Sequence, residues 1–264
     1  MTKIALGTVQ FGMNYGISNT TGKVSFDEIA KILDFCKCHD IDTLDTAQGY
    51  GESESVLGRF DLSRFKVITK LIGTARLETS LDNLKLNSVY GLMFHRENEC
   101  NDQTWSLFEN YKVQGLATKI GVSVYSPDIL NNLIVRYPID IVQFPLNILD
   151  QRFIPLLRKL KNKRIEVHTR SIFLQGLLLM KSIPDYFAEI EEKIKTIPFP
   201  RLEHALAFEK EQDGVDRMVL GVTRLQDLKE IIDAYNAKVE KIDYSKYTVT
   251  DEKYINPAMW KVKK

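Results

Sequence analysis

Cysteine and histidine are scarce in this sequence, with three and four copies among 264 residues. Cys36, Cys38 and Cys100 form neither an even disulfide set nor a metal-ligand spacing, and on a helix Cys36 and Cys38 would point to different faces. No pair of histidines or carboxylates has the spacing of a zinc site. We therefore expect reduced thiols and no bound metal.

The sequence also has no excess of one charge, because its 36 lysines and arginines are nearly balanced by 35 aspartates and glutamates. A formal charge of +1 gives no bulk field that would hold nucleic acid or an anionic membrane surface. The basic stretch 158–164 is not interleaved with aromatic residues, as a nucleic-acid site would require. Any phosphate that the protein binds must therefore be held by a local group of residues.

Long apolar runs are absent as well. No stretch approaches the roughly 20 apolar residues of a membrane-spanning helix. The amino-terminal segment MTKIALGTVQFG contains too short an apolar run for a secretory signal. These absences predict a cytoplasmic protein that binds neither membranes nor nucleic acid.

The sequence does contain a regular alternation of short apolar runs and segments with helical period, without linker-like tracts. Eight such units with right-handed crossovers predict an α/β fold, a single-domain (β/α)8 TIM barrel over residues 1–264. A doubly wound sheet is the disfavoured alternative, because no G-x-G-x-x-G follows the first run. The expected strands are 4–8, 42–47, 66–70, 89–95, 117–124, 139–146, 164–171 and 216–222. The expected helices start near 25, 53 and 127 or cover 75–84, 104–113, 153–162, 202–210 and 225–237.

Local signals mark two helix starts. Ser25 followed by Glu28 is a capping box, and Pro127 stands in the first turn of its helix. The tail 238–264 has no clear period, and we expect it to be an irregular cover over the barrel.

Ionisable side chains end three consecutive predicted strands. Asp45 ends the second strand and is followed by Tyr50 in a turn of small residues, Lys70 ends the third strand, and His95 ends the fourth. On a parallel barrel the active site lies at these carboxyl ends. An Asp–Lys pair can be purely structural and a histidine at a strand end can be a satisfied core residue, but the joint arrangement favours catalysis.

These residues, within D-T-A-x-x-Y-G-x-S-E at 45–54, ITK at 68–70 and FH at 94–95, resemble the catalytic tetrad of the aldo-keto reductase superfamily. The resemblance runs from LGTVQFG to the last barrel helix and implies carbonyl reduction by hydride transfer. Tyr50 would donate the proton, and Lys70, held charged by Asp45, would lower the tyrosine pKa from about 10. His95 would hydrogen-bond the carbonyl oxygen.

The resemblance also implies residues that hold the nicotinamide. Ser123 and Gln143 match the family's partners of the carboxamide, whereas Val124 stands where asparagine is expected. Thr8 and Asp45 complete this expected set.

In the segment TRSIFLQGLL after strand seven, Ser171, Leu174 and Gly176 match the family's cofactor-binding frame. Arg170 takes the position of the usual aromatic residue. A planar guanidinium can also stack on a ring, and its charge could touch the pyrophosphate or an acidic substrate.

The segment GVTRLQDLKEI after strand eight resembles the family's adenosine-phosphate site at a helix N-terminus. Gly221, Thr223, Arg224 and Glu230 match, while Asp227 replaces glutamine. Arg224 favours NADPH, but Asp227 would oppose a 2′-phosphate if it pointed inward. We expect NADPH as cofactor, with NADH as the alternative.

The expected activity is the NADPH-dependent reduction of a small-molecule aldehyde or ketone, by analogy a sugar or nucleotide-sugar carbonyl. Two alternatives are an NAD(P)-dependent aldose dehydrogenase with Tyr50 as base, and a cofactor-binding regulatory subunit without turnover, against which the intact tetrad argues. The expected substrate-binding residues are Gln10, Phe11, Tyr15, Tyr50 and His95.

Three further histidines have expected structural roles. His168 shares the inward face of its strand with Arg170 and is expected in the core or behind the site. His39 and His204 stand on predicted helices and are expected at the surface.

Overall fold

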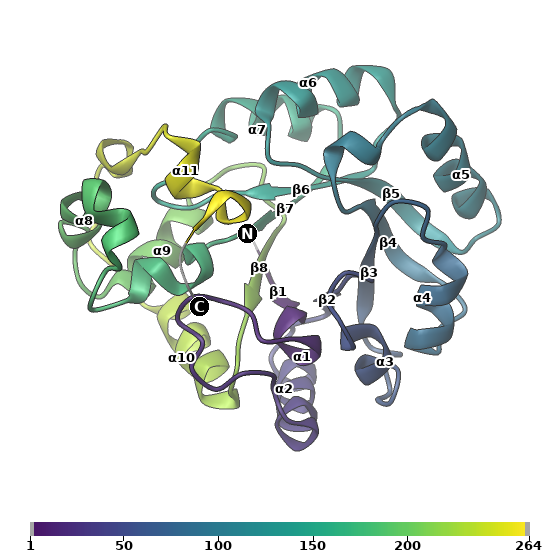
Figure 1. Ribbon diagram of the computed structural model, residues 1–264, viewed down its shortest axis with the longest axis horizontal. Coiled ribbons are helices and arrows are strands. Elements are labelled where there is room, and N and C mark those ends of the chain that lie inside the picture. Colours follow the sequence, from purple (N-terminus) through teal and green to yellow (C-terminus); the bar gives the residue numbers. More distant parts are fainter. Residues whose placement is uncertain (1–2, 262–264) are drawn as a thin grey trace.

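A computed structural model of the chain describes residues 3–261. Eight parallel strands close into a barrel, in which each strand pairs with the next and β1 pairs with β8 (Figure 1). The predicted (β/α)8 fold is confirmed. The strands are β1 (Lys3–Gly7), β2 (Thr43–Asp45), β3 (Lys66–Leu71), β4 (Val89–Phe94), β5 (Ala117–Ser123), β6 (Ile141–Pro145), β7 (Glu166–Arg170) and β8 (Arg217–Gly221).

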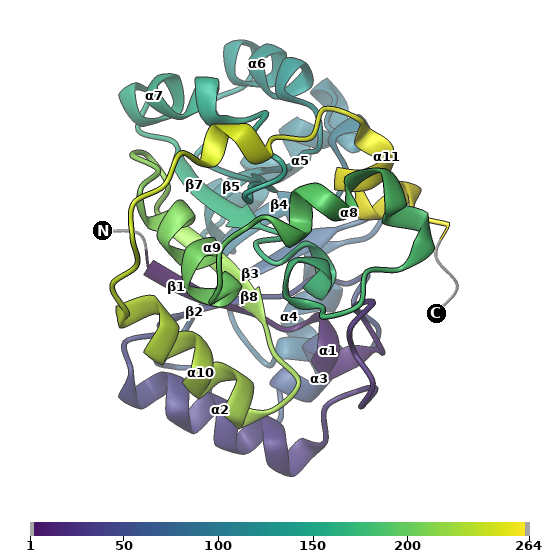
Figure 2. The same ribbon diagram turned by 90° about the vertical axis from the view of Figure 1, so that its left-hand side faces the viewer.

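Helices surround the ring of strands (Figures 1 and 2). The α-helices are α1 (Val9–Gly12), α2 (Phe26–Cys38), α3 (Ser53–Leu57), α4 (Leu77–Leu84), α5 (Asp102–Val113), α6 (Pro127–Arg136), α7 (Ile154–Asn162), α8 (Ala188–Lys195), α9 (Arg201–Lys210), α10 (Leu225–Asn236) and α11 (Glu252–Ile255). The 3₁₀ turns are η1 (Glu97–Glu99), η2 (Leu174–Leu179), η3 (Asp185–Phe187), η4 (Tyr244–Tyr247) and η5 (Pro257–Met259). The short helices α1, α8 and α11 were not expected from the sequence.

The strands are buried on both faces, between the barrel interior and the outer helices. All three residues of β2 and all five residues of β6 are buried. Two-sided burial explains why parallel strands read as continuous apolar runs. It also makes the buried polar side chains on the strands conspicuous, among them Asp45, Lys70, Gln143 and His168.

The two helix-start signals have different outcomes. Ser126 Oγ accepts from the amide of Ile129, with Pro127 in the first turn of α6. Ser25 Oγ accepts from the Glu28 amide at 3.3 Å, which is one half of the predicted capping box. The Glu28 carboxylate does not complete the box, because it accepts a hydrogen bond from the Leu225 amide at 2.7 Å, at the start of α10.

The tail covers part of the barrel and packs beside α8 (Figure 2). Tyr244, Tyr247 and Tyr254 are buried in it, and Tyr254 contacts the ring of Phe187. His204 on α9 is buried by this tail, with Nδ1 at 3.0 Å from the Tyr244 hydroxyl. The prediction that His204 lies at the surface is therefore wrong, because a segment without helical period covers it.

The three cysteines are free, with Cys36 buried and Cys38 exposed. Within residues 3–261, no three side chains of histidine, cysteine, aspartate or glutamate come together as metal ligands. The described helices include none that is long and apolar enough to cross a membrane.

Candidate active site

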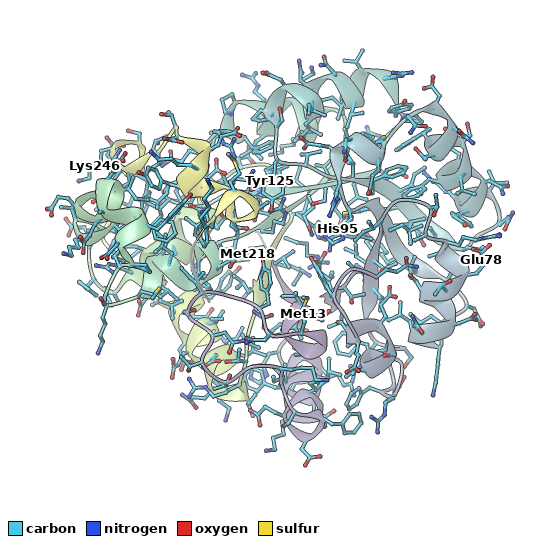
Figure 3. The ribbon with its side chains drawn as sticks, viewed as in Figure 1. Met13, Glu78, His95, Tyr125, Met218 and Lys246 are labelled. Carbon is cyan, nitrogen blue, oxygen red and sulfur yellow. The ribbon has the colours of Figure 1, made fainter. Side chains whose placement is uncertain are left out.

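The four ionisable residues at the strand ends meet at one point of the barrel rim. Lys70 Nζ lies 2.6 Å from Asp45 Oδ1 and 3.5 Å from the Tyr50 hydroxyl. The ring of His95 stands edge-on to the ring of Tyr50, with 5.5 Å between centroids. Figure 3 shows His95 in the middle of the ring of strands, far from peripheral residues such as Glu78. The predicted convergence of these side chains is therefore present in the fold.

Two glycines bring Tyr50 and His95 into place. A Cβ on Gly12 of α1 would lie 1.8 Å from the Tyr50 carbonyl oxygen, so only glycine lets α1 pack directly on this loop. A Cβ on Gly49 would lie 2.5 Å from Ile72 and 3.3 Å from the imidazole of His95. The small residues of the turn are thus needed for close approach of backbone to side chain.

The ammonium of Lys70 is completely buried and fully engaged. It donates to Asp45 and, at 2.9 Å, to the carbonyl oxygen of Thr46. Burial lowers the pKa of Lys70 below its ordinary value, and the charge of Asp45 opposes this change. The amine therefore keeps its charge only through the partner that the barrel places beside it.

The pKa of Tyr50 shifts opposite to the sequence prediction. Burial raises it above its ordinary value, the Asp45 charge raises it further, and the Arg170 charge lowers it. The prediction neglected that burial removes the phenol from water and that the negative charge of Asp45 also acts on Tyr50. Tyr50 therefore stays protonated at neutral pH, as a proton donor must be.

His95 is neutral at physiological pH. Burial, and then the charge of Lys70, lower the pKa of His95 to about 4. Its Nδ1 is buried and has no hydrogen-bond partner among residues 3–261. The ring therefore offers an unused polar nitrogen beside Tyr50.

Gln143 occupies the floor of the site. Its Nε2 donates to Asp45 Oδ2 at 2.7 Å, so Asp45 is held by Gln143 as well as by Lys70. Its Oε1 is buried and has no partner in the described part of the chain. Ser123 lies next to Gln143 in the register of β5 and β6. An open buried acceptor beside a serine hydroxyl fits the carboxamide of a nicotinamide.

A cavity of about 840 Å³ runs from the tetrad to the start of α10. Most residues predicted for the cofactor and substrate line it, namely Thr8, Gln10, Tyr15, Asp45, Tyr50, His95, Ser123, Gln143, Arg170, Ser171, Gly176, Gly221, Thr223, Arg224, Asp227 and Glu230. The cavity also takes in Arg96 and Tyr125, which the sequence analysis did not name. Both directly follow the carboxyl ends of predicted strands, the signal that would have found them.

Two predicted contact residues do not reach this cavity. Phe11 and Leu174 are fully buried and belong to the hydrophobic core. Phe11 packs inward from α1, and Leu174 turns inward where the backbone of η2 takes positive φ. Phe11, predicted to bind substrate, and Leu174, predicted to bind cofactor, therefore lie in the core and do not line the cavity. Lys70 also does not line the cavity. It is buried beneath the cavity floor and contacts Asp45 and Tyr50, which do line it.

The Arg170 side chain stacks on an aromatic ring and forms hydrogen bonds to uncharged oxygen atoms. Its guanidinium carbon lies 4.0 Å from the centre of the Tyr125 ring. Nη2 donates to the carbonyl of Val124 at 3.3 Å, and Nη1 lies 3.5 Å from Ser171 Oγ.

The predicted anion site at the start of α10 is filled from within the protein. Asp227 Oδ2 accepts from the amides of Thr223 at 3.2 Å and Arg224 at 3.0 Å. Asp227 Oδ1 pairs with Arg224 Nη2 at 2.6 Å. Together with Glu28 on the Leu225 amide, Asp227 takes up the donors that a phosphate would use.

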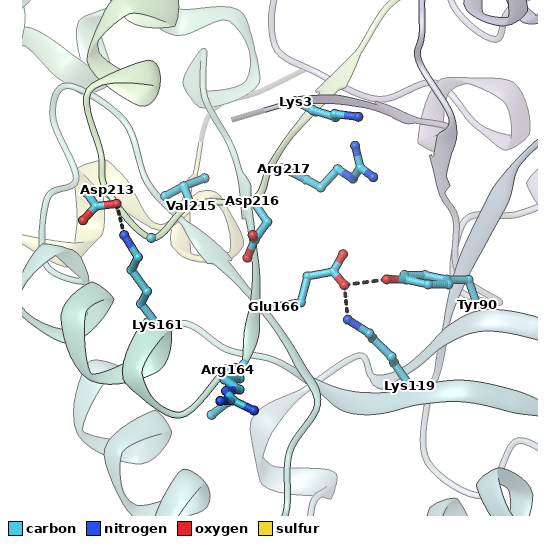
Figure 4. Close-up of a pocket in the computed structure, with 12 residues that line it drawn as sticks. Lys3, Tyr90, Lys119, Lys161, Arg164, Glu166, Asp213, Val215, Asp216 and Arg217 are labelled. Atoms are coloured by element: carbon cyan, nitrogen blue, oxygen red, sulfur yellow. Dashed lines mark hydrogen bonds and ion pairs between the residues drawn. The ribbon is translucent and has the colours of Figure 1, made fainter. Parts of the chain in front are cut away.

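A second cavity, of about 550 Å³, lies at the amino ends of the strands (Figure 4). At its centre, Glu166 accepts from the Tyr90 hydroxyl at 2.6 Å and from Lys119, and its other oxygen meets His168 Nε2 at 2.7 Å. Burial alone would raise the pKa of Glu166, but the hydrogen bonds together outweigh burial and lower that pKa below its ordinary value. His168 therefore belongs to a buried structural network, in agreement with its expected core position.

Comparisons with known proteins agree with this geometry. The model of the aldo/keto reductase family matches residues 3–252. A search of curated proteins gave no match. Among solved structures, a holo aldo-keto reductase from Bacillus halodurans superposes with a TM-score of 0.75 at 17% identity, covering 93% of this chain and 90% of its own. A glycerol dehydrogenase from Gluconobacter oxydans superposes with a TM-score of 0.67 at 18% identity, covering 90% of this chain and 87% of its own. At these identities the structural matches show the fold alone.

Proposed function

Since the chain belongs to the aldo/keto reductase family, we propose that it reduces an aldehyde or ketone with a nicotinamide dinucleotide, and that Tyr50 supplies the proton. The observation that carries this proposal is the placement of the Lys70 amine between Asp45, at 2.6 Å, and the Tyr50 hydroxyl, at 3.5 Å. The cleft that opens above these groups is large enough for a cofactor and a small substrate.

The bound cofactor would supply the hydride, and residues of the chain would hold the proton and donate it to the carbonyl oxygen. Addition of hydride to a carbonyl leaves negative charge on oxygen, which a positioned acid must neutralise. Tyr50 is protonated because burial raises its pKa. When it gives up the proton, the new phenolate charge lies next to the Lys70 ammonium. That interaction grows only as the reaction proceeds, so it stabilises the transition state more than the ground state.

His95 would orient the carbonyl. The pKa of His95, lowered by burial to about 4, keeps the imidazole neutral, so it can hydrogen-bond a carbonyl oxygen without bringing a second charge. Its position at the edge of the Tyr50 ring places both groups on one side of the cleft.

Several cavity residues would hold the cofactor. The unpartnered Oε1 of Gln143 and the Ser123 hydroxyl suit the carboxamide. Gly221 leaves room for Gln10, since a Cβ there would lie 2.6 Å from Gln10 Oε1. The adenosine end would lie near Thr223 and Arg224, at the far end of the same cavity.

The choice between NADPH and NADH depends on the start of α10. Arg224 supports NADPH, as the sequence suggested, and its side chain is 60% exposed. Asp227 and Glu28 argue for NADH, because their carboxylates occupy the local amides and would repel a 2′-phosphate. We therefore propose a nicotinamide cofactor and expect the internal carboxylates to reduce the advantage that Arg224 gives to NADPH.

Oxidation of a polyol or aldose is the second candidate function. The fold of the Gluconobacter glycerol dehydrogenase is similar, and the same tetrad can run in reverse. That direction needs the Tyr50 phenolate, which its raised pKa disfavours at neutral pH. The regulatory alternative without turnover is weaker, because the whole tetrad is assembled. A sugar or nucleotide-sugar carbonyl remains the substrate proposed by analogy.

Substitution Tyr50→Phe tests the proposal. We expect carbonyl reduction to fall by roughly 10²-fold or more, since general acids contribute factors of about 10²–10⁴. Binding of the reduced cofactor, followed by its own fluorescence, should change little because the phenyl ring is retained. A variant that no longer binds cofactor would indicate a structural tyrosine, and one that reduces carbonyls normally would reject the assigned role.

A further inference from the structure

The guanidinium of Arg170 carries a charge that the protein does not neutralise. It lies at the end of β7, lines the cleft, stacks on the face of Tyr125, and is hydrogen-bonded to two neutral oxygen atoms, those of Val124 and Ser171. Within residues 3–261, no carboxylate lies within 4.0 Å of it. A partly buried cation without a counter-charge is costly unless a ligand supplies one.

The charges in the rest of the cleft are arranged differently at its two ends. Lys70 is paired with Asp45, and Arg224 at the far end is paired with Asp227. Arg96, which lines the cavity on the same side as His95, has no carboxylate partner among the described residues either. At the adenosine end, the carboxylates of Asp227 and Glu230 line the cavity beside Arg224. At the reacting end, the half-buried Arg170 has no carboxylate partner among the described residues, whereas Arg96 is exposed to solvent.

Arg170 is close enough to influence the reacting groups. Burial is the main cause of the raised pKa of Tyr50 and of the lowered pKa of His95, and the Arg170 charge also acts on both. Tyr125, the residue on which Arg170 stacks, lines the same cavity as His95 and Tyr50. An anion bound by Arg170 would thus lie beside the reacting carbonyl.

We propose that Arg170 binds an anionic group, a carboxylate or a phosphate, on the carbonyl substrate. The inference rests on the proposed function, since it specifies the substrate class of that site. Stacking on Tyr125 fixes the plane of the guanidinium, and its fork of donors matches the geometry of both anions. The cofactor pyrophosphate has the same chemistry, but Arg170 stacks on Tyr125 and donates to the Val124 carbonyl, directly after Ser123 at the reacting end of the cleft, which favours the substrate.

The test compares paired substrates that differ by one anionic group. Succinic semialdehyde is measured against butanal, and glyceraldehyde 3-phosphate against glyceraldehyde, with the wild type, Arg170→Gln and Arg170→Lys. We expect the wild type to prefer the anionic member of at least one pair in kcat/KM, and the pair that shows it identifies carboxylate or phosphate. Arg170→Gln should reduce that preference by about tenfold or more, mainly through KM, and Arg170→Lys should retain part of it.

Arg76→Gln is the matched control, because Arg76 is exposed outside the cleft and pairs with Glu78. It should leave the substrate preference unchanged. Equal kcat/KM for charged and neutral members in the wild type would overturn the inference and leave the proposed reductase intact. A loss of cofactor affinity in Arg170→Gln with unchanged substrate preference would also overturn it, because the anion would then be the pyrophosphate.

Anion binding without turnover separates the two proposals. Malonate and inorganic phosphate are titrated into the protein by calorimetry. Binding of either anion that is lost in Arg170→Gln, with cofactor affinity unchanged, supports the anion site even if no carbonyl is reduced, in which case only the proposed function fails. Absence of binding of both anions to an enzyme that reduces only neutral aldehydes would reject the site.

Discussion

At the level of single residues, the site depends on a buried charge pair. Lys70 and Asp45 are both nearly inaccessible, with side chains 1% and 3% exposed, and they lie 2.6 Å apart. Gln143 adds one further hydrogen bond to Asp45. In such a pair, each charge is tolerated because the other is present, so loss of one partner costs more than loss of both.

This dependence predicts a non-additive mutant cycle. Lys70→Met should lower the free energy of unfolding by about 3–5 kcal/mol, because the Asp45 carboxylate is left buried with an uncompensated charge. The double variant Lys70→Met with Asp45→Asn should recover much of that loss, since no buried charge remains. Urea denaturation at neutral pH measures both. Additive losses would mean that the two side chains contribute to stability independently.

The sequence predicted which residues form the site better than it predicted their electrostatics. The order of Asp45, Tyr50, Lys70 and His95 at strand ends was sufficient to predict where they converge. The direction of the Tyr50 pKa could not be obtained in this way, because it depends on burial and on charge balance in three dimensions. The burial of Phe11 could not be predicted for a similar reason, since the sequence does not show which side of a short turn faces the core.

At the level of elements, the start of α10 is where this chain departs from its sequence-based expectation. Helix N-termini attract anions, and here two anions come from the protein itself. Asp227 comes from the first turn of α10, and Glu28 reaches across from α2. The sequence indicated the first of these carboxylates but not the second, because Glu28 fitted a capping box within its own helix.

Because carboxylates occupy the amides at the N-terminus of α10, we expect a substitution there to change the preference between NADPH and NADH. Asp227→Ser should increase the affinity for NADPH relative to NADH by about tenfold, because it removes a carboxylate and frees both Arg224 and two amides. The hydrogen bonds of Asp227 to the Thr223 and Arg224 amides are lost, so the free energy of unfolding should fall by about 1 kcal/mol, the usual contribution of a side chain that caps a helix N-terminus. Titration of both reduced cofactors, followed by their fluorescence, measures the ratio.

The companion variant Arg224→Ala controls for the charge of the arginine. It should weaken NADPH and hardly alter NADH. An unchanged ratio in Asp227→Ser, or equal losses for both cofactors in Arg224→Ala, would show that the 2′ position of the ribose is not recognised at this helix.

At the level of the whole molecule, the barrel and the tail are joined by many contacts. The amide of Val249 donates to the carbonyl of Leu149 at 2.8 Å, and the Tyr247 hydroxyl donates to the carbonyl of Thr196 at 3.1 Å. The barrel was predictable because eight strands repeat one pattern. The position of the tail could not be predicted from the sequence, because its contacts are long-range and its apolar residues follow no regular period.

The sequence contains two tryptophans, and they lie in these two parts. Trp105 is buried in α5 of the barrel. Trp260 lies in the tail and packs against Phe187, with 4.9 Å between the centroids of the two rings. Trp105→Phe and Trp260→Phe therefore give single-tryptophan proteins that report on the tail and on the barrel respectively. We expect their fluorescence transitions in urea to coincide, because burial of Tyr244, Tyr247 and Tyr254 joins the tail to the barrel core. A tail signal that is lost at clearly lower urea than the barrel signal would show that the tail unfolds separately, as a cover over a barrel that is stable without it.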